Sequence, residues 1–136
     1  DRGGDWSSDV CSSDLYKDFQ DGGATLALGS DAPTAPFAPL PNLYTATTRR
    51  SAREPNYVEK VNPHFALSLA AAISAATAGA AYSCFADAWT GRLAKGMKAD
   101  FVVMDMQWDA EKLLEAKVRE TWFEGIKVFD AELSKP

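Results

Sequence analysis

Apolar and polar positions change their spacing several times along the chain, and each change predicts an element. Residues 24–28 form a short apolar run between Gly22-Gly23 and the turn-forming sequence Gly29-Ser30-Asp31. A run bounded by turn residues in this way is typical of a buried β-strand. Residues 16–20 favour the end of a helix, with the two glycines as its stop signal. The pattern therefore predicts a helix and then a buried strand that ends at Asp31.

The chain after Asp31 is expected to form a loop and then a helix. Prolines at positions 33, 36, 39 and 41 predict an irregular loop, because proline fixes one backbone angle and removes an amide donor. Residues 42–50 have helical composition, and we interpret Arg49-Arg50 as a solvated helix end near the negative end of the helix dipole. Residues 51–62 are polar and without a period, which predicts a surface connection.

Residues 65–86 carry no charged side chain, so a membrane span has to be considered. The segment consists mostly of Ala, Ser, Thr and Gly, which lack the hydrophobicity that a span requires. We expect instead two short helices, at about 68–76 and 78–85, with a break near Thr77. Cys84 is expected to be a small buried hydrophobic residue in this setting.

The last third of the chain predicts a strand, a short helix and a hairpin. Residues 99–105 have strand character, and residues 110–117 form an amphipathic pattern with a helical period. Residues 118–123 and 126–129 flank Glu124-Gly125, which is typical of a hairpin with a two-residue turn. We expect the aromatic side chains of this hairpin to pack against their neighbours rather than to stack on bases.

Composition and charge exclude several kinds of partner. The formal net charge is −5, and the acidic residues are scattered without any basic stripe. We therefore expect no nucleic-acid partner and no membrane partner, and a small-molecule substrate is the natural alternative. The two cysteines have neither the number nor the spacing of a disulfide framework or a metal site. A cytoplasmic location is the default expectation, since Cys84 is compatible with it and a targeting segment would lie in the missing N-terminus.

The beginning of the chain differs from the rest. Residues 5–15, with the sequence DWSSDVCSSDL, are polar and show no hydrophobic period. They match a translated short-read sequencing adapter, and scars of this kind are excluded from fold reasoning. We expect residues 1–15 to be an artefactual or disordered tail and the natural protein to begin upstream of Tyr16.

Asp31 is the first candidate for chemistry, because the carboxyl ends of buried parallel strands are where α/β enzymes place their functional groups. An Asp after a strand is, however, more often a turn former or a helix cap. His64, the only histidine in the sequence, more often packs or caps than binds a metal in such a position. Gly91 and Gly96 suggest a phosphate-binding loop, but Met97-Lys98 stands where that loop needs Lys followed by Ser or Thr. No cofactor-binding residue is therefore predicted.

The order of five segments resembles the C-terminal end of a metal-dependent amidohydrolase, of the amidohydrolase family 3 type that includes N-substituted formamide deformylase-like enzymes. The segments are LGSDAP at 28–33, LYTATTRR at 43–50, the Ala-rich 71–81, GRLAKGMKADFVVMD at 91–105, and 121–129. The resemblance implies an α/β fold, namely the C-terminal part of a (β/α)8 TIM barrel followed by C-terminal strands of a small β-sandwich. Residues 16–88 would supply the last barrel strand and covering helices, and residues 89–136 the sandwich strands.

The same resemblance implies a function. Asp31 looks like the family's aspartate at the end of the eighth strand, a catalytic proton shuttle beside the metal and the one metal-site residue expected here. The metal would be divalent, with Zn²⁺ expected, and the substrate a small amide-type molecule whose non-peptide C–N bond is hydrolysed. The family's His-x-His after the first strand and its further His or Lys ligands are absent from this sequence. We therefore expect the 136-residue chain to be inactive by itself, and its oligomeric state is not predicted.

Two other functions stay open at this point. A small non-enzymatic α/β module could bind a partner through the aromatic C-terminal hairpin. A serine hydrolase could use Ser30 with His64 and an Asp, but it would lack the Gly-x-Ser-x-Gly elbow that positions such a nucleophile.

Overall fold

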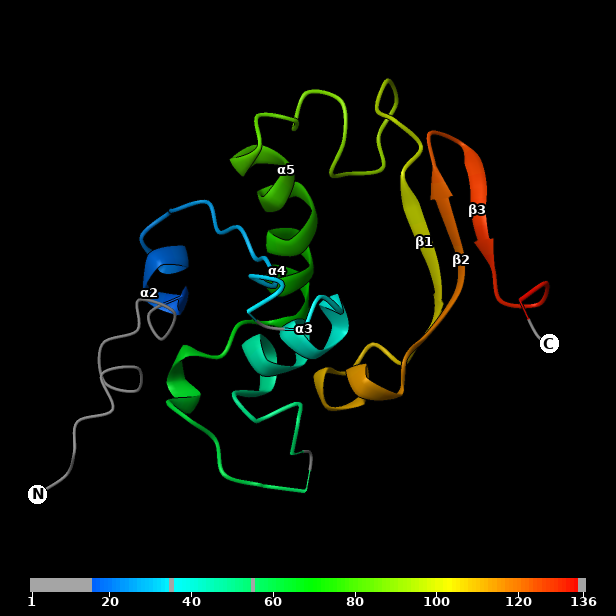
Figure 1. Cartoon of the computed structure of the whole chain (residues 1–136). Helices are drawn as coiled ribbons and strands as arrows, with labels where there is room; N and C mark the ends of the chain where they lie inside the picture. The colour runs from blue at the N-terminus through cyan, green and yellow to red at the C-terminus, as the bar shows by residue number, and fades with distance from the viewer. Residues whose placement is uncertain (1–15, 35, 55, 135–136) are drawn as a thin grey trace, which may run out of the picture.

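The computed structural model describes residues 16–34, 36–54 and 56–134, so the predicted tail at 1–15 lies outside the described residues (Figure 1). The α-helices of the described residues are α2 (Tyr16–Asp21), α3 (Pro39–Thr48), α4 (Leu69–Ser74) and α5 (Ala80–Ser83), with a π turn, η3 (Ala75–Gly79), between the last two. The same residues form two 3-10 helices, η2 (Pro63–Phe65) and η4 (Ala110–Glu115), and three strands, β1 (Phe101–Asp105), β2 (Lys117–Phe123) and β3 (Ile126–Asp130). None of the helices in this part of the chain has the length and hydropathy to cross a membrane.

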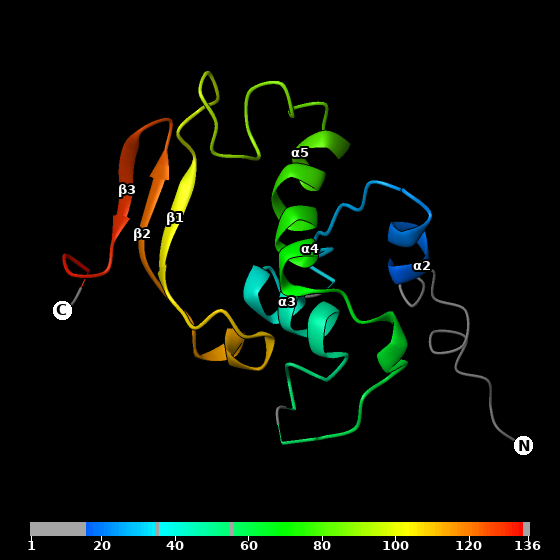
Figure 2. The ribbon, with the colours of Figure 1, turned by 180° about the vertical axis from the view of Figure 1, so that it is seen from behind.

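The core lies where α3 meets α4 and η4. Leu43, Tyr44 and Ala46 of α3 are buried there against Leu67 and Ala72. α3 begins at Pro39, three residues before the predicted start, because proline is well suited to the first turn of a helix, where no amide donor is needed. Figure 2 shows α3 lying across the foot of the long helix formed by α4, η3 and α5.

The Ala-rich segment forms one continuous helical stretch rather than two separated helices. The irregularity falls where the sequence predicts it, since the π turn Ala75–Gly79 contains Thr77, but the chain does not leave the helix. The Thr77 hydroxyl donates to the carbonyl of Ile73 at 2.8 Å, and Ser68 caps the start by accepting from the amide of Ala71. The irregularity therefore widens the helix without ending it.

The predicted strand at residues 24–28 is wrong. This segment is extended but pairs with no strand in the described part of the chain, and its neighbour is the long helix (Figure 1). Leu26 and Leu28 pack against the core, and the Leu28 amide donates to the carbonyl of Ala75 at 3.1 Å. A strand requires a neighbouring strand to accept and donate its backbone hydrogen bonds. The barrel implied by the resemblance is therefore not represented among the described residues.

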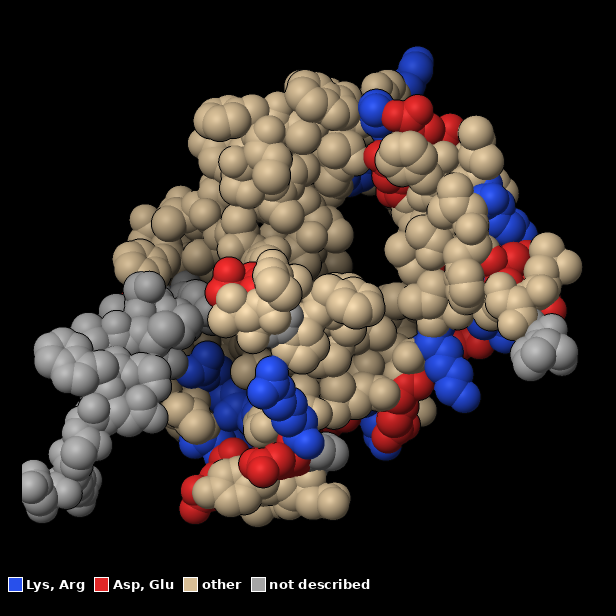
Figure 3. Space-filling model, in the orientation of Figure 1, with Lys and Arg blue, Asp and Glu red and all other residues tan. Residues whose placement is uncertain are grey.

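The sheet confirms the C-terminal predictions. β1, β2 and β3 form an antiparallel sheet in that order, and the hairpin turns at Glu124 and Gly125, which have positive φ angles of 50° and 79°. This is the backbone geometry of a two-residue hairpin turn. Residues 110–115 form a 3-10 helix instead of the expected α-helix. The fold is therefore mixed α/β, with a helical body beside a three-stranded sheet, and Figure 3 shows an opening between the two.

The connection between the sheet and the helical body depends on η4. Leu113 of η4 is completely buried, and η4 packs on α3. Arg50 Nη1 donates to Glu111 Oε2 at 2.6 Å across this contact. Arg49, at φ 59°, is buried, and its Nε donates to the carbonyl of Val61 at 2.9 Å. The expectation of a solvated helix end at this arginine pair is therefore wrong, because both arginines bind distant parts of the chain.

Asp100 links the loop before β1 to the hairpin turn. Its carboxylate accepts from the Glu124 amide at 2.7 Å and from the Thr90 hydroxyl at 2.9 Å. The Glu124 amide first, and then the Thr90 hydroxyl, lower the pKa of the Asp100 carboxyl below its ordinary value. A carboxyl whose pKa is lowered by folding stabilises the protein above its unfolded pKa, and that contribution is lost as the pH falls through the folded pKa.

We therefore expect Asp100→Asn to lower the melting temperature at neutral pH. The further decrease in melting temperature on acidification should be smaller in this variant than in the wild type. Thermal unfolding followed from pH 7 to pH 3 measures both effects. Asp18→Asn, at an exposed carboxylate of α2, is the matched control and should retain the wild-type pH dependence. An unchanged acid profile in Asp100→Asn would show that this carboxylate does not link the loop to the turn.

Candidate functional site

Asp31 lies at the end of the extended segment 24–31, just beyond the residues that anchor it to the helical body. Its side chain is exposed, and its backbone is in the left-handed region with φ 54°. Aspartate adopts this conformation more readily than most residues with a side chain. A cis peptide bond joins Ala32 to Pro33 directly after it. The segment thus presents one accessible carboxylate at the start of the proline-rich loop.

A cleft of about 410 Å³ begins one residue after Asp31. It is lined by Ala32, Pro33, Thr34, Pro36, Phe37 and Arg53. Among these residues Arg53 carries the charge, whereas Phe37 is 84% exposed. The cleft therefore combines an apolar wall with one cationic side chain.

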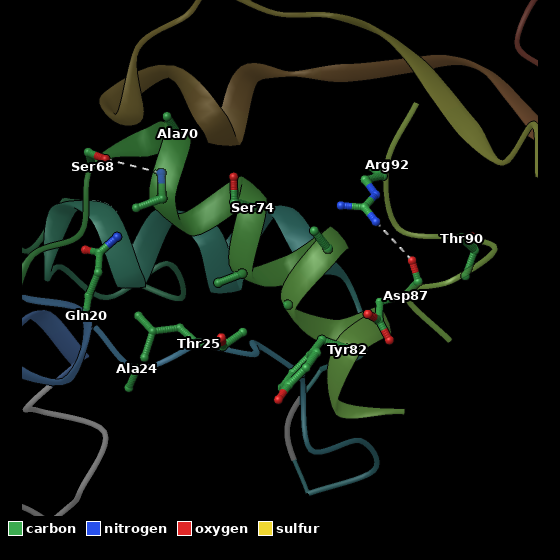
Figure 4. Close-up of a pocket in the computed structure, with 15 residues that line it drawn as sticks. Gln20, Ala24, Thr25, Ser68, Ala70, Ser74, Tyr82, Asp87, Thr90 and Arg92 are labelled. Atoms are coloured by element: carbon green, nitrogen blue, oxygen red, sulfur yellow. Dashed lines mark hydrogen bonds between the residues drawn. The ribbon is translucent and has the colours of Figure 1, made fainter. Parts of the chain in front are cut away.

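A larger groove of about 600 Å³ lies between the segment 24–26 and the long helix, and it does not include Asp31 (Figure 4). Its helical side consists of small residues, and its open end is bordered by Tyr82, Asp87, Thr90 and Arg92. Arg92 donates to the backbone carbonyl of Asp87 at 3.4 Å, which is a weak contact. The groove is thus mainly a crevice between a helix and an extended segment, without converging catalytic groups.

The described residues do not fit a complete metal site. No three His, Cys, Asp or Glu side chains gather anywhere in that part of the chain, whereas a tight zinc site typically has about four ligands. His64 lies in η2, and its ring contacts that of Phe65 with centroids 4.0 Å apart. His64 is exposed, and the described residues do not join it to Asp31 in a metal site.

Two further expectations concern reactive side chains. Among the described residues no hydrogen bond joins Ser30 to His64, so the structure offers no support for a serine hydrolase. Cys84 is exposed, and the prediction that it is buried is wrong. The reason is its place at the C-cap of α5, where Phe85, at 86% exposed, also leaves the core.

The aromatic residues of the hairpin have different environments. Trp122 stacks on Phe101 at 5.5 Å and donates from Nε1 to Glu120 at 2.8 Å, as expected of a packing residue. Phe123 is 57% exposed and Phe129 is 40% exposed, so neither is packed as expected. Phe123 ends β2 and Phe129 lies in β3, the edge strand of the sheet.

Sequence reasoning missed Arg53, which lines the cleft that begins after Asp31, and Gly79, which lies against the segment that leads to Asp31. Arg53 belongs to a segment predicted to be a surface connection, and no local pattern marks it. Gly79 did carry a signal, because an isolated glycine inside a helical segment usually has a packing reason. In the structure the backbone of Leu26 passes directly over Gly79.

Comparison of the sequence with known proteins identifies a family. A sequence model described as Amidohydrolase family matches residues 9–129. The chain belongs to the amidohydrolase family. The match includes residues 9–15, and the assignment of that stretch to an adapter stays a prediction, as does the domain boundary after residue 88.

A curated relative is known from a plant. Protein LONG AFTER FAR-RED 3 of Arabidopsis thaliana is 34% identical over 117 residues, which cover 85% of this chain and 20% of that protein. The chain thus spans about a fifth of the length of this relative. No solved structure matches the chain.

Proposed function

We propose that the chain is part of a metal-dependent amidohydrolase that hydrolyses non-peptide C–N bonds in small amide-type substrates, with Asp31 as its acid–base residue. The observation that carries the proposal is the family match over residues 9–129, combined with an exposed carboxylate at the end of an anchored segment. The deformylase-like type of amidohydrolase is part of the same proposal, and it rests on the resemblance of five segments of the sequence, from residues 28–33 to 121–129.

The chemistry of Asp31 follows from its accessibility. A carboxylate within hydrogen-bond distance of an attacking water can accept one of its protons while the water oxygen bonds to the carbonyl carbon of the substrate. The same carboxyl group can then give this proton to the nitrogen as the C–N bond breaks, which leaves the carboxylate as it began. Because Asp31 is exposed at the end of the segment, a water molecule and a substrate nitrogen can both reach its carboxylate.

The metal in this proposal needs ligands beyond those described. The family's general metal dependence supports a divalent ion, for which we propose Zn²⁺, and Asp31 is the residue of this chain that would lie beside it. Because one carboxylate does not make a tight site, we propose that the chain is inactive by itself. We also propose that residues 16–88 belong to a barrel and residues 89–136 to a β-sandwich in the complete enzyme.

The complete product of the gene tests the proposal. We expect the purified protein to contain a divalent metal and to release amine from at least one member of a panel of N-formyl and N-acyl amines. Removal of the metal by a chelator should abolish this activity, and Zn²⁺ should restore it. The gene should also encode a His-x-His motif after a strand. A complete product with neither metal nor hydrolysis would leave the non-enzymatic module, favoured by exposed Phe123 and Ile126, as the better candidate.

A further inference from the structure

The segment that ends at Asp31 is held at both ends of one widened helical turn. The Leu28 amide donates to the carbonyl of Ala75, the first residue of η3. The carbonyl oxygen of Leu26 lies 1.8 Å from the position that a Cβ atom would have at Gly79, the last residue of η3. No side chain fits in that space. The segment can therefore lie this close to the helix because residue 79 is a glycine.

A π turn is uncommon in a helix that only packs over other elements. Turns of this kind are rare and frequently occur at functional sites, and a glycine inside a helix costs stability relative to alanine. The Thr77 hydroxyl, which donates to the carbonyl of Ile73, lies within this same turn. A rare π turn and a destabilising helix glycine thus occur together where the segment that leads to Asp31 contacts the helix.

We propose that Gly79 and the π turn Ala75–Gly79 position Asp31 for its proton transfers. The inference rests on the proposed function of Asp31, and it makes Gly79 a positioning residue, not a catalytic one. A methyl group at residue 79 would have to move the Leu26 oxygen from 1.8 Å to at least 3.0 Å. Asp31 follows on the same extended segment, three residues beyond the Leu28 anchor. A displacement of about 1 Å at a catalytic group can lower turnover about 10²-fold.

Gly79→Ala in the complete gene product tests the inference. We expect a loss of turnover of about 10²-fold, a shifted acid limb in the pH profile of kcat/KM, and faster hydrogen exchange at the Leu28 amide. Gly29→Ala is the matched control for hydrogen exchange, since a Cβ at residue 29 meets no atom within 4 Å. Leu113→Ala, which removes a buried side chain from the contact of η4 with α3, controls for lost stability and should not shift the pH profile.

Leu26→Ala provides a second variant that loosens the segment from its own side, because this side chain packs against the core. It should show the same pH shift and faster exchange, so the inference stays testable if Gly79→Ala does not fold. Normal turnover and an unshifted pH profile in a variant with faster Leu28 exchange would overturn the positioning role, while Asp31→Asn would still be inactive. Full turnover in Asp31→Asn would overturn the proposed function of Asp31 and, with it, this inference.

Discussion

Asp31→Asn is expected to lower the turnover of the complete gene product by about 10²- to 10⁴-fold, which is the usual contribution of a general acid–base residue. Asparagine has nearly the same shape as aspartate, but it cannot accept a proton from water and return it to a leaving nitrogen. Because Asp31 is exposed and has φ 54°, a conformation that asparagine also adopts, the variant should fold normally. Steady-state hydrolysis of an N-acyl amine and the melting temperature are to be measured on the same samples.

Metal content separates the two roles assigned to Asp31. A proton shuttle can be replaced without loss of the metal, so we expect Asp31→Asn to retain most of it. Asp87→Asn, which alters a carboxylate bordering the larger groove, is the matched control and should hydrolyse the substrate at the wild-type rate. Turnover within a few-fold of wild type in Asp31→Asn would contradict the acid–base role.

Local signals explain which parts of the fold could be predicted from the sequence. Glu124-Gly125 and Gly22-Gly23 determine backbone conformation within a few residues, and the hairpin and the end of α2 occur where these pairs predict them. The same argument located the irregularity at Thr77. These turn and break signals were therefore confirmed, although a π turn was not distinguished from a break.

The segment 24–28 was not assigned correctly because its pattern has two physical explanations. Leu26 and Leu28 are partly buried while Thr25 and Ala27 are exposed, which is the alternation of a half-buried strand. An extended chain lying against a helix buries alternate residues in the same way. Only the partner of its backbone amides differs, and for Leu28 that partner is the Ala75 carbonyl. Sequence periodicity reports burial and does not identify the neighbour.

In the candidate site, too, local features could be predicted from the sequence and tertiary contacts could not. The residue type and position of Asp31 were evident from a carboxylate after an apolar run, whereas its support by the Gly79 turn was not. Arg49 and Arg50 likewise gave no sign of their partners, Val61 and Glu111, which are distant in the sequence. Contacts between remote segments depend on tertiary packing, so local patterns in the sequence do not reveal them.

The largest loss of stability is expected from Leu113→Ala. Leu113 has no exposed surface and belongs to the core formed with α3. Replacing a buried leucine by alanine typically lowers the free energy of unfolding by about 2–5 kcal/mol, since it removes apolar contact and leaves a cavity. Urea unfolding of the complete gene product, followed by circular dichroism, measures this difference.

Leu114→Ala is the matched control. The Leu114 side chain is 37% exposed, so its replacement should lower the free energy of unfolding much less. The comparison also tests how the sheet is joined to the helical body. Since η4 packs on α3 through Leu113 and the Arg50–Glu111 pair, weakening this contact should allow the hairpin to exchange its amides before α3 does. Equal effects of the two alanines, with hairpin and helix exchanging together, would contradict this role of η4.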